Sequence, residues 1–473
     1  MSPLAALAAS VSPWRAGGPA PTAPGPAMKR EARATSGSRL RRSLRACTAE
    51  GLFAEVFNAC AGGAVLTGWA IHLRVGTLVT GLVVALPQLA QVAQIPGAWT
   101  TAWLGHRRAC IGFVLAARLV ALPLALLPLW RPSQATAGAL LIAVASAAAL
   151  LAVLGNNAWT SWMGELVPRR IRGRYFGRRA GLCTAGGALA SAGAGVLLDW
   201  ARPRGLEGAA LAVLQLAAGA VGITTAILMA RQHDPSPLVE VPPRSLRPAF
   251  RPFGDRSVRG LVTYLAAWNL AVGVAGSFFA LHMLQNLRMG FTLIALHGAA
   301  LATARMVAAP LWGRAIDRLG ARPVLVTCSF GIAAIPLIWF FATPERLWPL
   351  AFDAISAGVL WGGHSLATFS LPLSVTPKRG RPHYLAAFSL TSGVSFSLAT
   401  ALAGAVGGAL PAHFEVAHHA FFSLQVLFAV TVPLRFAAAF LALRIHEPAA
   451  AGIGALLAEV RPAPTREPRR AAG

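Results

Sequence analysis

A few amide, imidazole and carboxylate side chains interrupt the long apolar runs of this sequence. Asn156 and Asn157 share one run, and His364 stands in another. An amide and a neutral imidazole both donate and accept hydrogen bonds, and an imidazole also takes up a proton near neutral pH. These residue types predict a site that holds the polar group of a small molecule. The alternative is ordinary hydrogen bonding between neighbouring helices.

Other polar residues in apolar runs extend this candidate site. Glu55 and Asn58 lie about one helical turn apart, so they share a helix face. Glu55, His364 and Asp353 could each carry a coupling proton. The alternative for Glu55 is a position at the membrane interface, and the alternative for Asp353 is a place among lipid headgroups.

The sequence lacks the motifs of soluble catalysis. It contains no GxxxxGK[ST] phosphate loop, no HExxH and no GxSxG. The five cysteines form no CxxC pair or metal-ligand spacing, so we expect no metal, no cofactor and no structural disulfide. These observations argue against an enzyme.

Composition places the chain in a lipid environment. Hydrophobic residues make up 56% of the sequence and charged residues 12%, against about 25% charged in a typical soluble domain. The net charge of +26 comes from short Arg clusters between apolar runs rather than from one basic face. We therefore expect the lipid bilayer, and not nucleic acid, as the partner.

A helix needs about 20 mostly apolar residues to cross a bilayer. The sequence predicts twelve such helices, Leu52–Leu73, Leu78–Ile95, Ala109–Trp130, Ala135–Ala158, Phe176–Leu198, Leu206–Ala230, Leu261–Leu284, Leu293–Trp312, Pro323–Phe341, Leu347–Leu371, Leu385–Leu410 and Ala420–Leu443.

The runs divide the chain into five parts. We expect a disordered basic arm over residues 1–50, with Met28 an alternative start, and six-helix bundles over 51–231 and 259–446. Prolines fill the connection over 232–258, which predicts a linker. Residues 447–473 form a tail.

The basic residues also predict an orientation, because cytoplasmic loops hold an excess of Lys and Arg. If the N-terminus is cytoplasmic, 33 of the 42 basic residues fall on the cytoplasmic side and 6 on the opposite side. Both termini are therefore predicted to be cytoplasmic.

The two halves of the sequence have similar features at matching positions. One loop also resembles the signature of a known family. Aligning Pro168 with Pro377 pairs the fourth predicted helix with the tenth, as expected for parallel six-helix repeats. The segment GRAIDRLGARP resembles the cytoplasmic loop signature of the major facilitator superfamily, and the stretch from Trp159 to Arg179 resembles bacterial members of that family. The residues that match the loop signature are Gly313, Asp317, Arg318, Gly320 and Arg322. Arg172 and Gly173 lie in the loop after the fourth helix, which matches the loop after the tenth helix, and they are further candidate gating residues.

This resemblance implies an all-α membrane protein with twelve helices in two pseudo-symmetric bundles. It also implies that the first, fourth, seventh and tenth helices line a central cavity. The candidate cavity residues are Asn58, Asn156, Asn157, Trp268, Asn269, Trp361 and His364. Asn156 or Asn157 is then expected to share one pocket with His364.

The resemblance further implies that Asp317 belongs to a cytoplasmic gate. The corresponding first-half loop, around Gly105, Arg107 and Arg108, lacks the aspartate and has Trp103 near its place. This departure leaves two interpretations. The favoured one is a monomeric secondary transporter in a bacterial inner membrane, moving a small organic solute with protons and favouring efflux. The alternative is a non-transporting scaffold or sensor on the same fold.

The topology can be tested with reporter fusions. A reporter fused after Arg131 should lie outside the cytoplasm, and a reporter fused after Arg231 should lie inside, because basic loops stay cytoplasmic. Alkaline phosphatase and green fluorescent protein fusions at both points report the two sides. The same side at both points would contradict the predicted topology.

Overall fold

The polar backbone dictates the architecture, because peptide groups in lipid must bond to one another. The computed structural model describes residues 26–130, 132–234, 251–376, 381–411, 413–416 and 419–447, and helices cover the twelve predicted runs. Ten segments are long and apolar enough to cross a membrane on their own. The other two predicted membrane crossings correspond to the segment 77–104 and to the helix Trp348–Val375. The protein is therefore a multi-pass helical membrane protein.

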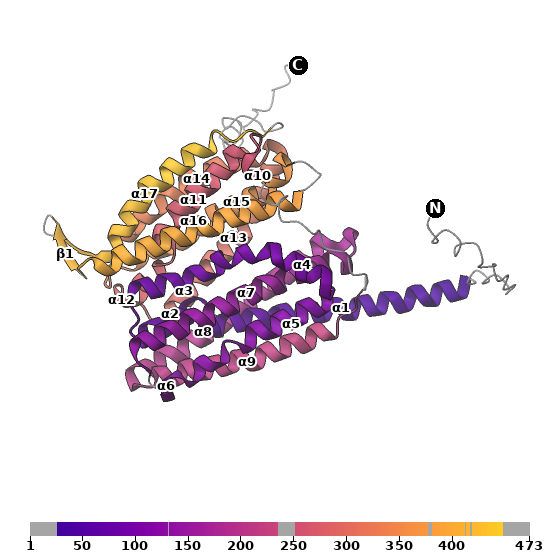
Figure 1. The fold of residues 1–473 in the computed structure, drawn as a ribbon, viewed down its shortest axis with the longest axis horizontal. Helices are drawn as coiled ribbons and strands as arrows, with labels where there is room; N and C mark the ends of the chain where they lie inside the picture. The colour runs from indigo at the N-terminus through magenta and orange to yellow at the C-terminus, as the bar shows by residue number, and fades with distance from the viewer. Residues whose placement is uncertain are drawn as a thin grey trace, which may run out of the picture.

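The helices of the first half form one bundle (Figure 1). They are α1 (Pro26–Ala61), α2 (Gly63–His72), α3 (Thr77–Leu89), η1 (Ala90–Ala93), α4 (Gln94–Leu104), α5 (His106–Leu119), η2 (Leu122–Leu126), α6 (Leu127–Trp130), α7 (Gln134–Leu166), α8 (Arg169–Ala201), η3 (Arg202–Arg204) and α9 (Glu207–Ala230).

The helices of the second half form the other bundle. They are α10 (Arg251–Gly254), α11 (Arg259–Gly276), α12 (Phe279–Gln285), α13 (Phe291–Leu319), α14 (Ala321–Ala334), η5 (Ile335–Phe340), α15 (Trp348–Val375), α16 (Arg381–Ala409) and α17 (Ser423–Ala442).

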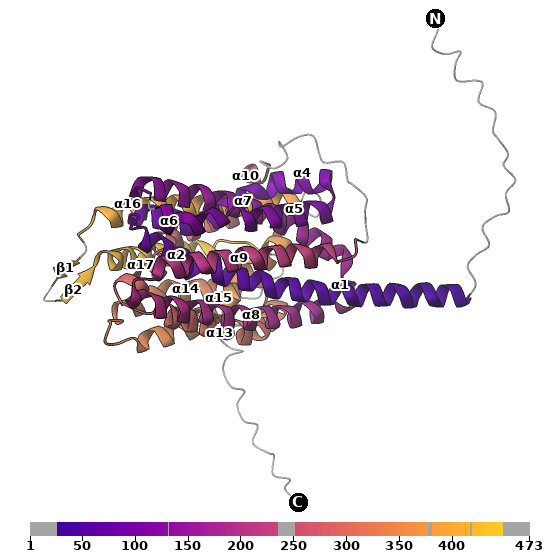
Figure 2. The same ribbon diagram turned by 90° about the horizontal axis from the view of Figure 1, so that it is seen from below.

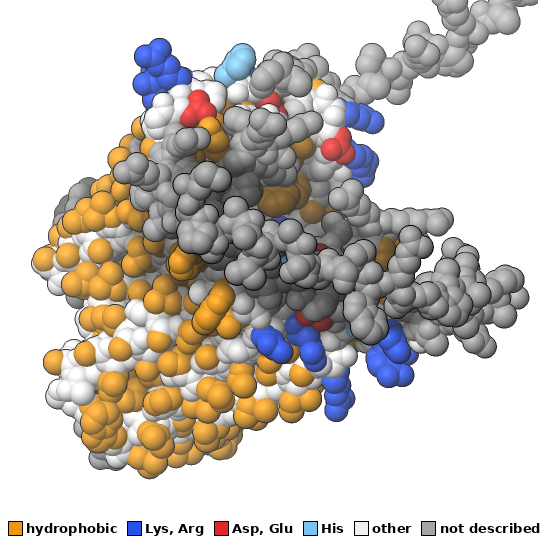
Figure 3. Space-filling model, turned by 45° about the vertical axis from the view of Figure 1, so that its right-hand side comes forward, with side chains coloured by type: hydrophobic (Ala, Val, Ile, Leu, Met, Phe, Trp, Pro, Cys, Tyr) orange, Lys and Arg blue, Asp and Glu red, His pale blue; other side chains and the backbone are white. Residues whose placement is uncertain are grey.

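The two ends of the molecule differ. An antiparallel hairpin of β1 (His413–Val416) and β2 (His419–Phe422), which the sequence reading did not predict, lies at one end, here named the hairpin end. The start of α1 projects from the opposite end, named the linker end (Figure 2). Hydrophobic side chains cover the flank between them, and basic residues gather toward the linker end (Figure 3). This pattern fits a bilayer around the flank.

The predicted disordered arm is wrong in its C-terminal part. α1 begins at Pro26, and Ser43, Cys47 and Glu50 are buried against the first bundle. Residues 1–25, 235–250 of the linker and 448–473 of the tail lie outside the described part. The apolar run that began at Leu52 thus marks only part of a longer helix.

The bundles meet tightly at the hairpin end. Trp69 and Leu198 of the first half share a buried core with Phe278, Phe291 and other aromatic residues of the second half. The Asp199 carboxylate, at the end of α8, accepts hydrogen bonds from the backbone N–H groups of Phe291 and Thr292 at 2.7 and 2.9 Å. A carboxylate is favourable at the N-terminus of a helix, so this contact closes the hairpin end between α8 and α13.

Two glycines make equivalent turns in the two halves. Gly105 separates α4 from α5 with φ 80° and ψ 148°, and Gly320 separates α13 from α14 with φ 92° and ψ 167°. Only glycine adopts this backbone region readily. The signature loop and its counterpart in the first half therefore share one geometry although their side chains differ.

Gly320→Ala should lower the stability of the protein. A Cβ in this backbone region costs about 1–3 kcal/mol, which thermal unfolding in detergent should report as a lower midpoint. Gly313→Ala is the matched control, because Gly313 lies within α13 with open space around it and alanine favours a helix. Equal midpoints for both variants would contradict the role of the turn.

Candidate functional site

A buried ion pair joins the first helix to the fifth crossing. Glu50 of α1 and Arg179 of α8 lie 3.1 Å apart between Oε2 and Nη2, and 4% and 16% of their side chains are exposed. Arg179 also donates from Nε to the carbonyl of Cys47 at 3.1 Å and stacks over the Trp159 ring. Several contacts therefore hold this guanidinium in one place.

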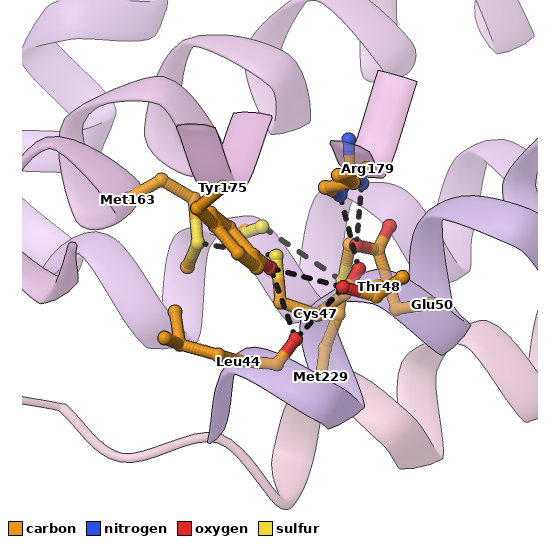
Figure 4. Close-up of polar contacts among 9 residues, drawn as sticks. Leu44, Cys47, Thr48, Glu50, Met163, Tyr175, Arg179 and Met229 are labelled. Atoms are coloured by element: carbon orange, nitrogen blue, oxygen red, sulfur yellow. Dashed lines mark hydrogen bonds and ion pairs between the residues drawn. The ribbon is translucent and has the colours of Figure 1, made fainter. Parts of the chain in front are cut away.

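The surrounding contacts fix the same region (Figure 4). The Tyr175 hydroxyl donates to the carbonyl of Leu44 at 3.0 Å, and Thr48 approaches the same hydroxyl at 3.4 Å. A Cβ at Gly51 would lie 2.3 Å from Nη2 of Arg179, so glycine leaves the space that the guanidinium occupies. Neither Glu50 nor Arg179 was predicted as a site residue.

The ion pair borders a cavity of about 320 Å³ in the first bundle. Its polar lining consists of Glu50, Glu55, Asn58, Arg118, Asn156, Trp159 and Arg179. Glu55 and Asn58 also line a second cavity, of about 530 Å³, between α1, α8 and α13. Glu55 and Asn58 therefore lie between the charged residues of the first bundle and the interface between the two bundles.

The two predicted asparagines of α7 have different surroundings. Asn156 is exposed and lines the 320 Å³ cavity. Asn157 instead donates from Nδ2 to the backbone carbonyl of Gln94 at 3.0 Å. This contact is the interhelical hydrogen bond that the sequence left as the alternative.

The predicted residues of the second half gather in another cavity. Trp268, Asn269, Trp361 and His364 line a space of about 250 Å³, together with Gln88 of α3. His364 is buried, lies 2.8 Å from the Tyr264 hydroxyl and stacks on Trp268. Asn156 and His364 therefore line different cavities in this conformation, and the expected shared pocket is not formed.

Asp353 lies inside the second bundle rather than among headgroups. It is 3% exposed, accepts from Trp339 Nε1 at 2.9 Å and contacts His297 Nε2 at 2.9 Å. Arg435, also buried, donates to Thr431 and to the carbonyl of Ile332. These contacts account for both residues structurally, and a coupling role of Asp353 stays a prediction.

The signature loop is anchored by a residue outside it. The Glu447 carboxylate accepts from the backbone N–H groups of Ala321 and Arg322, at 3.3 and 2.8 Å, and from the Ser374 hydroxyl. Asp317 is exposed and makes no hydrogen bond or ion pair with the described residues. The carboxylate at this helix N-terminus is thus supplied by Glu447, and a gating role of Asp317 stays a prediction.

The loop arginines make matching contacts in the two halves. Arg322 donates to the carbonyl of Leu443 at the end of α17, and Arg107 donates to the carbonyl of Ala230 at the end of α9. Each arginine follows its turn glycine by two residues. Each loop is thereby tied to the last helix of its own half.

Two further predicted loop residues, Arg172 and Gly173, belong to α8, and the side chain of Arg172 falls outside the described part.

A hydrogen bond holds the end of the linker, where the Tyr384 hydroxyl donates to Asp255 at 2.6 Å. This bond, with further bonds from Ser257, lowers the pKa of the Asp255 carboxyl. It ties the end of the linker to α16.

The sequence and fold are similar to those of known proteins. Residues 51–400 and 269–470 match the family model described as Major Facilitator Superfamily. The human major facilitator superfamily domain-containing protein 10 is 33% identical over 114 residues, which cover 24% of each chain. The tetracycline resistance protein, class H, of Pasteurella multocida is 30% identical over 132 residues, covering 27% of this chain and 32% of that protein. These matches span at most about a third of either relative.

Solved structures resemble the whole fold. A nucleoside transporter superposes with a TM-score of 0.62 at 12% identity, covering 86% of this chain and 99% of that one. A bacterial homologue of the iron transporter ferroportin, in its inward-facing state, gives 0.63 at 14% identity, covering 85% and 98%. At such identities the likeness establishes the fold alone.

Arg179→Met should destabilise the protein because it leaves the Glu50 carboxylate buried without its partner. Breaking such a pair costs about 3–5 kcal/mol, and adding Glu50→Gln should recover most of this loss. Thermal unfolding of the single and double variants measures both effects. Arg178→Met is the matched control, since Arg178 is exposed on the same helix. A double variant no more stable than Arg179→Met would contradict the pairing.

Proposed function

Because the chain belongs to the Major Facilitator Superfamily, and is thus a secondary transporter rather than an enzyme, we propose that it exports a small organic solute in exchange for protons. The observation that carries this proposal is the pair of adjacent cavities that share Glu55 and Asn58 as lining residues. They extend from a charged site in the first bundle to the interface between the bundles.

The closed hairpin end supports alternating access. The core around Trp69, Leu198 and Phe291 and the Asp199 contact seal this end, so the cavities belong to a state closed there. If the linker end is cytoplasmic, as the basic residues predict, this state is closed to the outside. Separation of α8 from α13 would then open the opposite access path, as in other two-bundle transporters.

Glu55 is the residue that we assign to proton exchange. Its carboxylate lines both cavities and makes no hydrogen bond or ion pair within the described part of the chain. Glu50, in contrast, is held by Arg179. An unpaired carboxylate in a membrane cavity is a functional position by default, and a proton neutralises it at low cost.

Several observations fit export. The cavities have mixed polar and apolar linings, which suit an amphipathic solute. One sequence relative is named a tetracycline resistance protein, which agrees with removal of a foreign organic compound. We place the protein in a bacterial inner membrane, as a monomer with both termini in the cytoplasm and with lipid and the solute as its partners.

Glu55→Gln should abolish exchange between solute and protons. Purified protein is reconstituted in liposomes that contain the pH dye pyranine, and tetracycline, ethidium and norfloxacin are added in turn. For each compound that wild-type protein transports, solute movement should be accompanied by opposite proton movement, which the variant loses.

Glu165→Gln is the control, because Glu165 is a carboxylate outside the two cavities. Solute movement without proton movement in the wild type would overturn proton coupling. Full proton exchange retained in Glu55→Gln would remove Glu55 from this role.

A further inference from the structure

The cavity in the first bundle contains four charged side chains, and only two of them pair. Glu50, Glu55, Arg118 and Arg179 all line it. The Glu50–Arg179 ion pair neutralises one carboxylate and one guanidinium. One charge of each sign, on Glu55 and Arg118, is therefore available for an occupant.

Arg118 is unusual because its stem packs against Gly222 while its guanidinium contacts an aromatic ring and no hydrogen-bonding group of the described residues. Its guanidinium carbon lies 3.7 Å from the centre of the Phe57 ring. Its buried Nε has no hydrogen-bond partner, and the described residues offer its guanidinium no ion pair within 4.0 Å. A guanidinium in a membrane span normally has an anionic or carbonyl partner. The cavity therefore contains a guanidinium for which the described residues supply no anionic partner within 4.0 Å.

Glu55 offers the complementary charge. Its side chain lies against Gly187 of α8, where a Cβ would come within 3.6 Å of Oε2. The absence of a side chain at Gly187 lets α8 approach the Glu55 stem closely, and Glu55 lines both cavities. Glu50, Glu55 and Arg118 all line the same cavity, which places the three charged groups close to one another.

We propose that the transported solute is a zwitterion with an apolar body, whose anionic group binds Arg118 and whose cationic group binds Glu55. Val114, Ala117 and Trp159 line the same cavity and supply apolar surface for the body. A buried charge without a partner is unfavourable, and an occupant with both charges would satisfy the two residues together.

This inference rests on the proposed function and gives it a mechanism. A solute ammonium group and a proton would compete for the same Glu55 carboxylate, and such competition produces exchange. The anionic group would bind Arg118 without displacing a proton. A solute with only one of the two charges would leave one side chain unsatisfied.

Matched indole compounds test the two charges separately. Tryptophan carries both groups, tryptamine lacks the carboxylate, 3-indolepropionate lacks the amine, and 3-ethylindole lacks both. Binding to full-length protein in nanodiscs is measured at equilibrium by calorimetry. Tryptophan should bind at least about tenfold more tightly than either singly charged compound, as expected for a charge-assisted hydrogen bond.

The variants assign each charge to its partner. In Arg118→Gln, tryptophan and tryptamine should bind equally, while the preference over 3-indolepropionate persists. In Glu55→Gln the reverse should hold. Arg305→Gln is the control, since Arg305 is a membrane-span arginine that lines none of these cavities, and it should keep the wild-type order. Thermal unfolding without ligand checks that each variant is folded, and Arg118→Lys, which keeps the charge, should restore part of the carboxylate preference.

A smaller scaffold, with phenylalanine, phenethylamine and 3-phenylpropionate, guards against a misfit of the indole ring. No preference for the zwitterion in either set, or equal loss for all compounds in both variants, would overturn the assignment. Charge-selective binding without proton exchange in liposomes would instead refute the proposed function and leave the assignment standing. Proton exchange driven equally by singly charged solutes would refute the assignment alone.

Discussion

The structure depends on one constraint, which is that charge inside a bilayer needs a partner within the protein. Glu50 meets it through Arg179, Asp353 through His297 and Trp339, and Arg435 through Thr431 and a backbone carbonyl. Arg118 and Glu55 are the exceptions among the charges that line the first-bundle cavity. Their lack of a partner, rather than their mere presence in a helix, distinguishes the proposed solute site from the structural pairs.

The two bundles have the same backbone geometry at their loops, but different kinds of side chain line their cavities. The turns at Gly105 and Gly320 and the arginines that follow them make the same contacts in both halves. The cavity of the first bundle is charged, whereas the cavity around His364 is lined largely by aromatic and amide side chains. The two halves thus share the contacts of their loops and differ in the side chains that line their cavities.

Hydropathy and basic residues predicted the helices well, because lipid imposes one structure on every apolar run. The same reasoning could not identify Glu50 and Arg179. Glu50 stood before the first apolar run, and Arg179 belonged to a basic cluster that orientation alone explained. Their pairing depends on where α1 and α8 lie in space. The scarcity of acidic residues, 16 in the chain, was the signal that could have drawn attention to Glu50.

The Asp199 contact makes the two seams between the bundles mechanically unequal. Along the α8–α13 seam a carboxylate must release two backbone donors, whereas at Gly81 and Gly404 of the α3–α16 seam small residues face the Phe278 ring and Leu78. Hydrogen bonds thus hold the first seam, whereas close packing of glycines against apolar side chains forms the second. Opening at the hairpin end would therefore begin with α8 leaving α13, and the bundles would swing about the other seam rather than separate evenly.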